Sequence, residues 1–305
     1  MKKIYNLIFT IVLISIILIV YLNIDKIVDF TVKLFGDNKE ITLEDANEYK
    51  RSYSNIHLKN FDSVSDYTPY NIDDINMIIY NVLNNGWENF TFYCPKEYKN
   101  CKEDVETATK DKKTLSNISN YVSPFNSYKK ISSNVYVDGK VELVVEKNYT
   151  EEEIDKINTE VDKIINELNL NNLSTRNKII KIHDYFVLRT KYDNVRSESG
   201  ESEFSSNKAI GPLFEGYAIC SGFSDVMAIF LDKLGIPNIK VASDKHVWNL
   251  AYVGGKWLHI DLTWDLPLET TKENIHTFLL INTTNLKKLD TTEHIWDENF
   301  YIEAN

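Results

Sequence analysis

The stretch 216–265 constrains the fold most strongly, because it passes from a helical pattern to a strand pattern. In its first half, apolar residues recur at the i, i+3, i+4, i+7 spacing of one buried helix face. These residues are Phe223, Val226, Met227, Phe230, Leu231 and Leu234. Gly235 and Pro237 end the predicted helix. Cys220 therefore lies at the helix N-terminus, where unpaired backbone N–H groups and the macrodipole favour a thiolate over a thiol.

The second half of this stretch predicts a β-hairpin. The segments 246–253 and 256–263 are separated by two glycines, a strong signal for a two-residue turn. This turn sets a register in which His246 and Asp261 are diagonal neighbours on one face. Their Cβ atoms would lie about 7–8 Å apart, which a His–Asp hydrogen bond can span. A bulge of one residue would instead turn the two side chains to opposite faces.

A cysteine, a histidine and an aspartate together can carry out nucleophilic acyl transfer. The thiolate attacks a carbonyl, the imidazole moves the proton, and the carboxylate orients the imidazole. Cys220, His246 and Asp261 are therefore the candidate catalytic residues. Alone, Cys220 would be more typical of a small packing residue, and the two strands are what favour catalysis. His259 is the alternative base, but no carboxylate lies in register with it, so we expect it to be structural.

Three motifs in this stretch resemble the transglutaminase-like superfamily, papain-related cysteine enzymes with a Cys-His-Asp triad. GYAICSGFSDVMAIFLDKLGIP resembles the nucleophile helix, DKHVWN the histidine strand, and GGKWLHIDLTWD the aspartate strand. With the upstream helix KIHDYFVLRTKYD, the resemblance covers roughly residues 174–301. It implies an α+β, papain-like catalytic domain in which the nucleophile helix packs on an antiparallel sheet. It also implies that Cys220, His246 and Asp261 form the triad.

Two aromatic residues near these motifs are candidates for binding the substrate. Tyr217 precedes the nucleophile by three positions and could help to bind the oxyanion. The backbone N–H of Cys220 is the stronger candidate donor for that role. Trp248 could line a substrate cleft, although aromatic residues on strands belong to the core more often.

The N-terminus predicts a membrane-spanning helix. The segment from Ile4 to Leu22 contains no charged residue, and as a helix it would be about 28 Å long, close to the bilayer core. Two lysines precede it, so the positive-inside rule places the N-terminus in the cytoplasm and the rest of the chain outside. No alanine or glycine occurs before Gly36 to form a signal-peptide cleavage site. We therefore expect an uncleaved signal anchor over 1–24, followed by a juxtamembrane linker over 25–50.

The remaining chain divides into two predicted units. Residues 51–148 combine a helical pattern over 72–83, a strand over 88–93 and a hairpin around Asp138-Gly139. We expect a small α+β domain of unknown role there. The catalytic domain is expected over 149–305.

Cysteine usage bears on the compartment and on metal binding. Cys94 and Cys101 lie close together within 51–148, and in an exported domain they could pair and leave Cys220 as the free thiol. Two reduced cysteines are the alternative, because spacing alone does not fix the Cα distance. We expect no metal there, since two thiols without nearby histidines do not supply four zinc ligands.

The charge of the chain limits its partners. The formal net charge of −11 argues against nucleic acid and against anionic membrane surfaces. We expect an extracytoplasmic, cofactor-independent enzyme that forms a thioester between Cys220 and an amide of a cell-surface protein or peptide. The resemblance implies either hydrolysis of the thioester or its transfer to an amine. The alternative is a catalytically silent transglutaminase-like module that binds cell-surface protein or glycan. The sequence does not indicate the oligomeric state.

Overall fold

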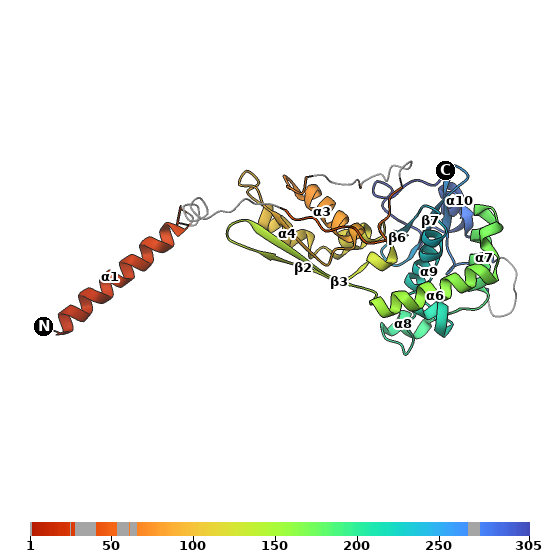
Figure 1. Cartoon of the computed structure of the whole chain (residues 1–305), viewed down its shortest axis with the longest axis horizontal. Coiled ribbons are helices and arrows are strands. Elements are labelled where there is room, and N and C mark those ends of the chain that lie inside the picture. Colours follow the sequence, from red (N-terminus) through yellow and green to blue (C-terminus); the bar gives the residue numbers. More distant parts are fainter. Residues whose placement is uncertain (1, 25, 28–40, 54–60, 62–65, 268–274) are drawn as a thin grey trace.

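The described N-terminal part of the chain begins with a long helix. The computed structural model describes residues 2–24, 26–27, 41–53, 61, 66–267 and 275–305. Helix α1 (Lys2–Leu22) begins the described chain, and much of the linker expected over 25–50 lies outside the described residues (Figure 1). Within the described part of the chain, no helix is both long and apolar enough to cross a membrane. The signal anchor over 1–24 therefore stays a prediction.

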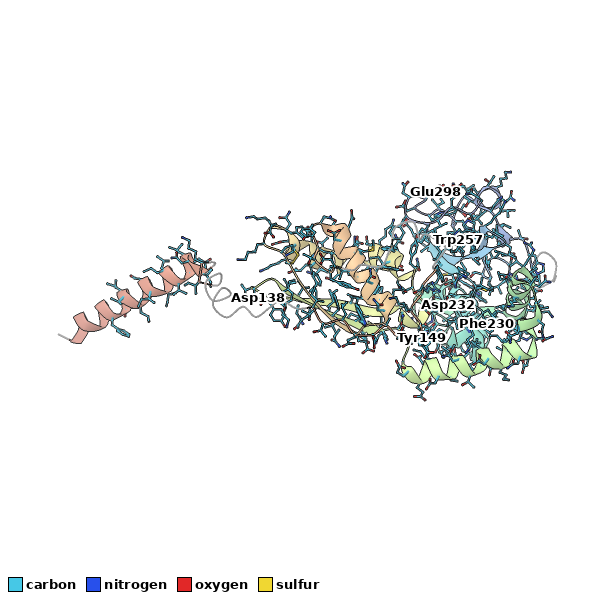
Figure 2. All side chains as sticks on the ribbon, turned by 45° about the horizontal axis from the view of Figure 1, so that its top comes forward. Asp138, Tyr149, Phe230, Asp232, Trp257 and Glu298 are labelled. Atoms are coloured by element: carbon cyan, nitrogen blue, oxygen red, sulfur yellow. A yellow bond between two sulfur atoms is a disulfide. The ribbon has the colours of Figure 1, made fainter. Side chains whose placement is uncertain are left out.

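The unit that follows combines helices with a three-stranded antiparallel sheet of order β1-β3-β2 (Figure 1). Asn71 caps its first helix by accepting hydrogen bonds from two backbone N–H groups, and Gly86 ends that helix with a φ of 75°. Asp138 lies at the far tip of the long hairpin, as Figure 2 shows. The elements are α3 (Ile72–Asn85), β1 (Asn89–Tyr93), α4 (Cys101–Ala108), α5 (Lys112–Ser119), η1 (Pro124–Asn126), β2 (Tyr128–Val135) and β3 (Lys140–Lys147).

The C-terminal unit is a four-stranded antiparallel sheet of order β6-β7-β8-β9 with helix α9 packed against β6 and β7 (Figure 1). The predicted α+β class is confirmed, and a helix does pack on an antiparallel sheet. The helices and turns are α6 (Glu151–Glu167), η2 (Leu170–Asn172), α7 (Thr175–Val187), α8 (Asn194–Ser199), η3 (Gly211–Glu215), α9 (Cys220–Lys233) and α10 (Thr283–Leu289). The strands are β4 (Lys191–Tyr192), β5 (Tyr217–Ala218), β6 (Asn238–Ala242), β7 (Val247–Val253), β8 (Lys256–Ile260) and β9 (Leu279–Ile281).

The β7–β8 hairpin has the predicted register. Val253 pairs with Lys256 across two glycines with positive φ, and the ladder runs back without a bulge to Asn249 opposite Ile260. The strands are shorter than expected, so His246 and Asp261 lie immediately outside the ladder. Because the register is unbroken, the side chains of His246 and Asp261 point to the same face of the hairpin.

Buried apolar side chains form two clusters, one on each side of the four-stranded sheet. One cluster joins α6, α7 and α9 to the sheet and includes Phe186 and Phe230 (Figure 2). The other is continuous from the first unit to the sheet and the C-terminal tail, and it includes Phe92, Trp248 and Tyr301. The segments 51–148 and 149–305 thus share one core, although their elements form separate sheets.

Candidate active site

Cys220 is the first residue of α9 and is partly buried. The N-cap residue Ile219 makes no side-chain hydrogen bond to the helix, so no side chain caps the N–H groups of the first turn. A Cβ on Gly222 would lie 2.2 Å from the Ser206 carbonyl oxygen, so only glycine allows this approach. The adjacent hydroxyl of Ser221 donates a hydrogen bond to the backbone carbonyl of Asn207 at 3.0 Å. This hydroxyl is therefore not free to replace the Cys220 thiol as the nucleophile.

The segment before α9 is held in place by one arginine. Arg196 donates to the hydroxyl of Ser206 at 3.0 Å and to the carbonyl of Phe204 at 2.7 Å. The Ser206 hydroxyl in turn donates to the buried carboxylate of Asp193 at 2.6 Å. These contacts fix the backbone on which the first turn of α9 rests.

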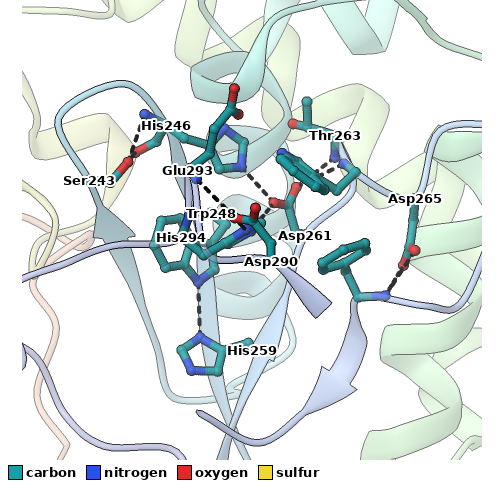
Figure 3. A network of polar contacts seen from close by, with 12 residues as sticks. Ser243, His246, Trp248, His259, Asp261, Thr263, Asp265, Asp290, Glu293 and His294 are labelled. Carbon is teal, nitrogen blue, oxygen red and sulfur yellow. Dashed lines mark hydrogen bonds and ion pairs between the residues drawn. The ribbon is translucent and has the colours of Figure 1, made fainter. Parts of the chain in front are cut away.

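His246 and Asp261 are in direct contact, as Figure 3 shows. His246 Nε2 lies 2.6 Å from Asp261 Oδ2, and the two side chains are only 3% and 2% exposed. Asp261 Oδ1 accepts the backbone N–H groups of Thr263 at 2.8 Å and Trp264 at 3.2 Å. The carboxylate is therefore held in one orientation toward the imidazole.

The imidazole of His246 interacts with both of the other candidate residues. Burial lowers the pKa of His246, but the charge and hydrogen bond of Asp261, together with a hydrogen bond to Cys220, outweigh it and raise the pKa to about 10. Burial raises the pKa of Asp261, but the positive charge of His246 outweighs it and holds that pKa well below its usual range. Since Nε2 is bound to Asp261, Nδ1 is the nitrogen left for Cys220. The structure thus places His246 against Asp261, and the effect of Cys220 on the pKa of His246 is consistent with a position near the ring.

A second buried histidine, His294, also contacts Asp261. His294 Nε2 lies 2.9 Å from Asp261 Oδ2, and its Nδ1 lies 2.8 Å from Asp290 Oδ2 (Figure 3). Its side chain is 0% exposed. Both of its ring nitrogens therefore face carboxylate oxygens. His294 therefore extends the pair to a chain of four groups: Asp290, His294, Asp261 and His246.

Asp290 is held as a carboxylate by its surroundings. Burial raises its pKa, but hydrogen bonds from Thr292 and His294 outweigh it and hold the pKa well below the usual range. The Asp290–His294 spacing of four residues was the only sequence signal for this contact. Nothing local indicates that the tail returns to the sheet, which it does through a bridge between Ser243 and Trp296.

His259 occupies a structural position, as expected. Its Nδ1 accepts the indole N–H of Trp248 at 2.9 Å, and its Nε2 lies 3.1 Å from the hydroxyl of Thr283. Burial and the nearby charge of His294 lower the pKa of His259 to about 3. A neutral imidazole with both nitrogens engaged in the core cannot serve as the base for Cys220.

The two aromatic candidates have different surroundings. Trp248 is 1% exposed and stacks on His246 with ring centroids 5.6 Å apart. It supports the imidazole from within the core, and this burial disagrees with a place on a substrate cleft. Tyr217 lies in β5 and stacks on Phe204 at 4.1 Å. Its part in binding the oxyanion stays a prediction.

Two further features concern metals and thiols. His246, Asp261 and His294 place ligand atoms within 4.8 Å of one another, and all three belong to the chain of groups described above. Cys94 and Cys101 form a buried disulfide with a Cα–Cα distance of 5.7 Å. Cys220 is the free cysteine.

Comparison with known proteins finds a family match for part of the chain. Residues 162–262 match the family model of the transglutaminase-like superfamily, which confirms the resemblance for the segment that carries all three candidate residues. A solved structure titled "Crystal structure of a TGase" aligns over 49% of this chain with 18% identity and a TM-score of 0.35. The alignment spans 47% of that protein. No curated protein matches the chain.

Proposed function

We propose that this protein is a thiol-dependent acyl-transfer enzyme that forms a thioester on Cys220. The observation that supports this most is the buried 2.6 Å contact between His246 Nε2 and Asp261 Oδ2. It fixes the imidazole, whose pKa is also raised by Cys220 at the N-terminus of α9. A module that only binds a partner would not require this combination of three groups.

In the first half of the proposed reaction, the Cys220 sulfur attacks the carbonyl carbon of a peptide or glutamine side-chain amide. The oxyanion lies at the N-terminus of α9, where the backbone N–H of Cys220 donates to it. When the C–N bond breaks, its electron pair goes to nitrogen, which takes the proton from the imidazolium of His246. A thioester and a neutral imidazole remain.

In the second half, water or a primary amine attacks the thioester carbon. The imidazole of His246 takes a proton from the attacking group, and the C–S electron pair returns to the sulfur of Cys220. Asp261 stabilises the imidazolium that forms again. Water gives a peptidase or a deamidase, whereas a lysine amine gives a cross-linking enzyme.

The proposed substrate is a protein or peptide outside the cytoplasm, with the enzyme anchored by residues 1–24. The uncharged segment Ile4–Leu22 and the preceding lysines support this proposal. The Cys94–Cys101 disulfide also supports it, since such bonds persist in oxidising compartments. If protease added to intact cells fails to digest the chain beyond residue 36 and digests it only after lysis, the proposed orientation is wrong.

The reaction is tested by mass spectrometry of glutamine-containing peptides incubated with the full-length protein, with and without a primary amine. We expect deamidation or cleavage without the amine, or addition of the amine when it is present. Cys220→Ala should give neither product. Peptides that remain unchanged but bind to both proteins would favour the silent module instead.

A further inference from the structure

Outside the candidate active site, His183 of α7 lies between two carboxylates. Its side chain is 0% exposed, and its Nε2 lies 3.1 Å from Oδ2 of the buried Asp265. Its Nδ1 lies 3.1 Å from Asp184 Oδ1. Asp265 already accepts the backbone N–H of Phe278 with both oxygens, so its position is fixed. Both ring nitrogens of His183 thus face carboxylate oxygens, and Nδ1 gives up its proton and its contact with Asp184 when it binds a metal.

A second imidazole approaches the same oxygen of Asp184. His276 Nε2 lies 2.6 Å from Asp184 Oδ1, and the two histidine rings are 5.5 Å apart at 60°. The Nδ1 of His183, the Oδ1 of Asp184 and the Nε2 of His276 all lie within 4.8 Å of one another. His276 and Asp184 are 49% and 33% exposed, so this cluster opens to solvent on one side.

We propose that His183, Asp184 and His276 bind a zinc ion. Two imidazole nitrogens and one carboxylate oxygen are a common three-ligand set for Zn²⁺, and the exposed side leaves a fourth position for water. Ligand atoms around tetrahedral zinc lie roughly 3.3 Å apart. The observed distances of 2.6 and 3.1 Å need only a small outward rotation of the two exposed side chains.

The buried partner of His183 matches what a zinc site requires. A metal-bound histidine usually donates its other N–H to a carboxylate, which fixes the ring and raises its basicity as a ligand. Asp265 is in that position relative to His183. The carbonyl of Phe278, whose N–H binds Asp265, accepts the N–H of Asp261 at 3.1 Å. A metal ion bound here would therefore help to hold in place the segment that carries the Asp261 carboxylate.

The test is titration of the metal-free full-length protein with Zn²⁺ by calorimetry, followed by Co²⁺ substitution. We expect one tight site and a Co²⁺ spectrum without a thiolate charge-transfer band. His276→Ala changes an exposed side chain and should lower the Zn²⁺ affinity by more than about 100-fold, beyond the 10–100-fold typical of outer-shell changes. Asp184→Asn should have a similar effect.

His246→Ala is the matched control, because His246, Asp261 and His294 are the other group of described residues that could hold a metal ion. This variant should keep the wild-type Zn²⁺ affinity and Co²⁺ spectrum. If zinc binding survives in His276→Ala and is lost in His246→Ala, the metal belongs to the candidate active site and the proposal is wrong. Absence of any zinc binding to the folded wild-type protein overturns it as well.

Discussion

At the residue scale, the central group is the carboxylate of Asp261. Its Oδ2 receives hydrogen bonds from two imidazoles, His246 and His294, and its Oδ1 receives two backbone N–H groups. A carboxylate with this many donors cannot rotate freely. It can therefore hold the ring of His246 in the orientation that acyl transfer needs.

We expect His294→Gln to slow acylation of Cys220 by roughly 10-fold, which is about 1.4 kcal/mol in transition-state free energy. The side chain of glutamine cannot contact Asp261 and Asp290 from opposite sides as the two ring nitrogens do. The measurement is the rate of thioester formation with an activated ester across a range of pH, where a positioning role also shifts the profile. His259→Gln is the matched control, since His259 makes its hydrogen bonds to Trp248 and Thr283. Equal rates and equal pH profiles in both variants would contradict a role for His294.

The raised pKa of His246 predicts how stability depends on pH. The folded state raises this pKa from 6.5 to about 10, so the folded protein binds the proton more tightly than the unfolded chain does. The resulting stabilisation is fully present below about pH 6.5 and is lost as the pH rises through about 10. This group alone should lower the free energy of unfolding by up to about 1.4 kcal/mol per pH unit within that window.

Urea unfolding of the wild type and His246→Gln between these pH values measures this contribution. The variant should lose less stability than the wild type as the pH rises. His259→Gln should keep the wild-type slope, because the pKa of His259 is lowered to about 3 and the ring is neutral throughout. A His246→Gln slope equal to that of the wild type would show that His246 does not hold its proton as described.

At the element scale, α9 is positioned by a backbone contact that requires glycine at residue 222. Alanine in place of glycine normally stabilises a helix by about 1 kcal/mol. Here the new Cβ would lie 2.2 Å from the Ser206 carbonyl oxygen, so the first turn and the segment beneath it must separate. We expect Gly222→Ala to destabilise the protein by about 1–3 kcal/mol and to slow acylation of Cys220. Increased stability in urea unfolding would rule out this tight contact.

The elements that could be predicted from the sequence are those that depend on residues close together in the chain. Helix α9 and the β7–β8 hairpin depend on apolar periodicity and a two-glycine turn, so Cys220, His246 and Asp261 could be placed from the sequence. The contact between His294 and Asp261 joins the tail to β8 and depends on long-range packing. The burial of Trp248 depends likewise on the first unit and the tail, which cover its face of the sheet.

At the scale of the whole molecule, the first unit is part of the core rather than a detached domain. The backbone N–H of Lys240 in β6 donates to the carbonyl of Asn120, whose side chain donates to Tyr301 in the tail. The buried guanidinium of Arg51 also pairs with Asp232 at the end of α9. Local sequence patterns predicted some of the elements of both units, such as α3, α9 and the β7–β8 hairpin, but could not indicate this shared interior.

The disulfide in the first unit predicts a distinct labelling pattern. Without reduction, alkylation should modify Cys220 alone, because Cys94 and Cys101 are bonded to each other. All three should react after reduction and unfolding. Closing so short a loop is worth about 2 kcal/mol, so the double variant Cys94→Ser/Cys101→Ser should be less stable by that amount yet still form the thioester. Mass spectrometry that finds three labelled cysteines in the unreduced protein would contradict this assignment.

The measurement that tests the account most directly is thioester formation with an activated ester in folded variants of the full-length protein. Cys220→Ala should form none, and His246→Ala should be nearly as inactive because no other group can move the proton. Asp261→Asn should retain more activity. Its loss of rate should be smaller than the loss of about 10⁴-fold in turnover that the equivalent change causes in serine proteases. His259→Ala should stay within a few fold of the wild type. An inactive His259→Ala beside an active His246→Ala would contradict the assignment of the base and, with it, the proposed mechanism.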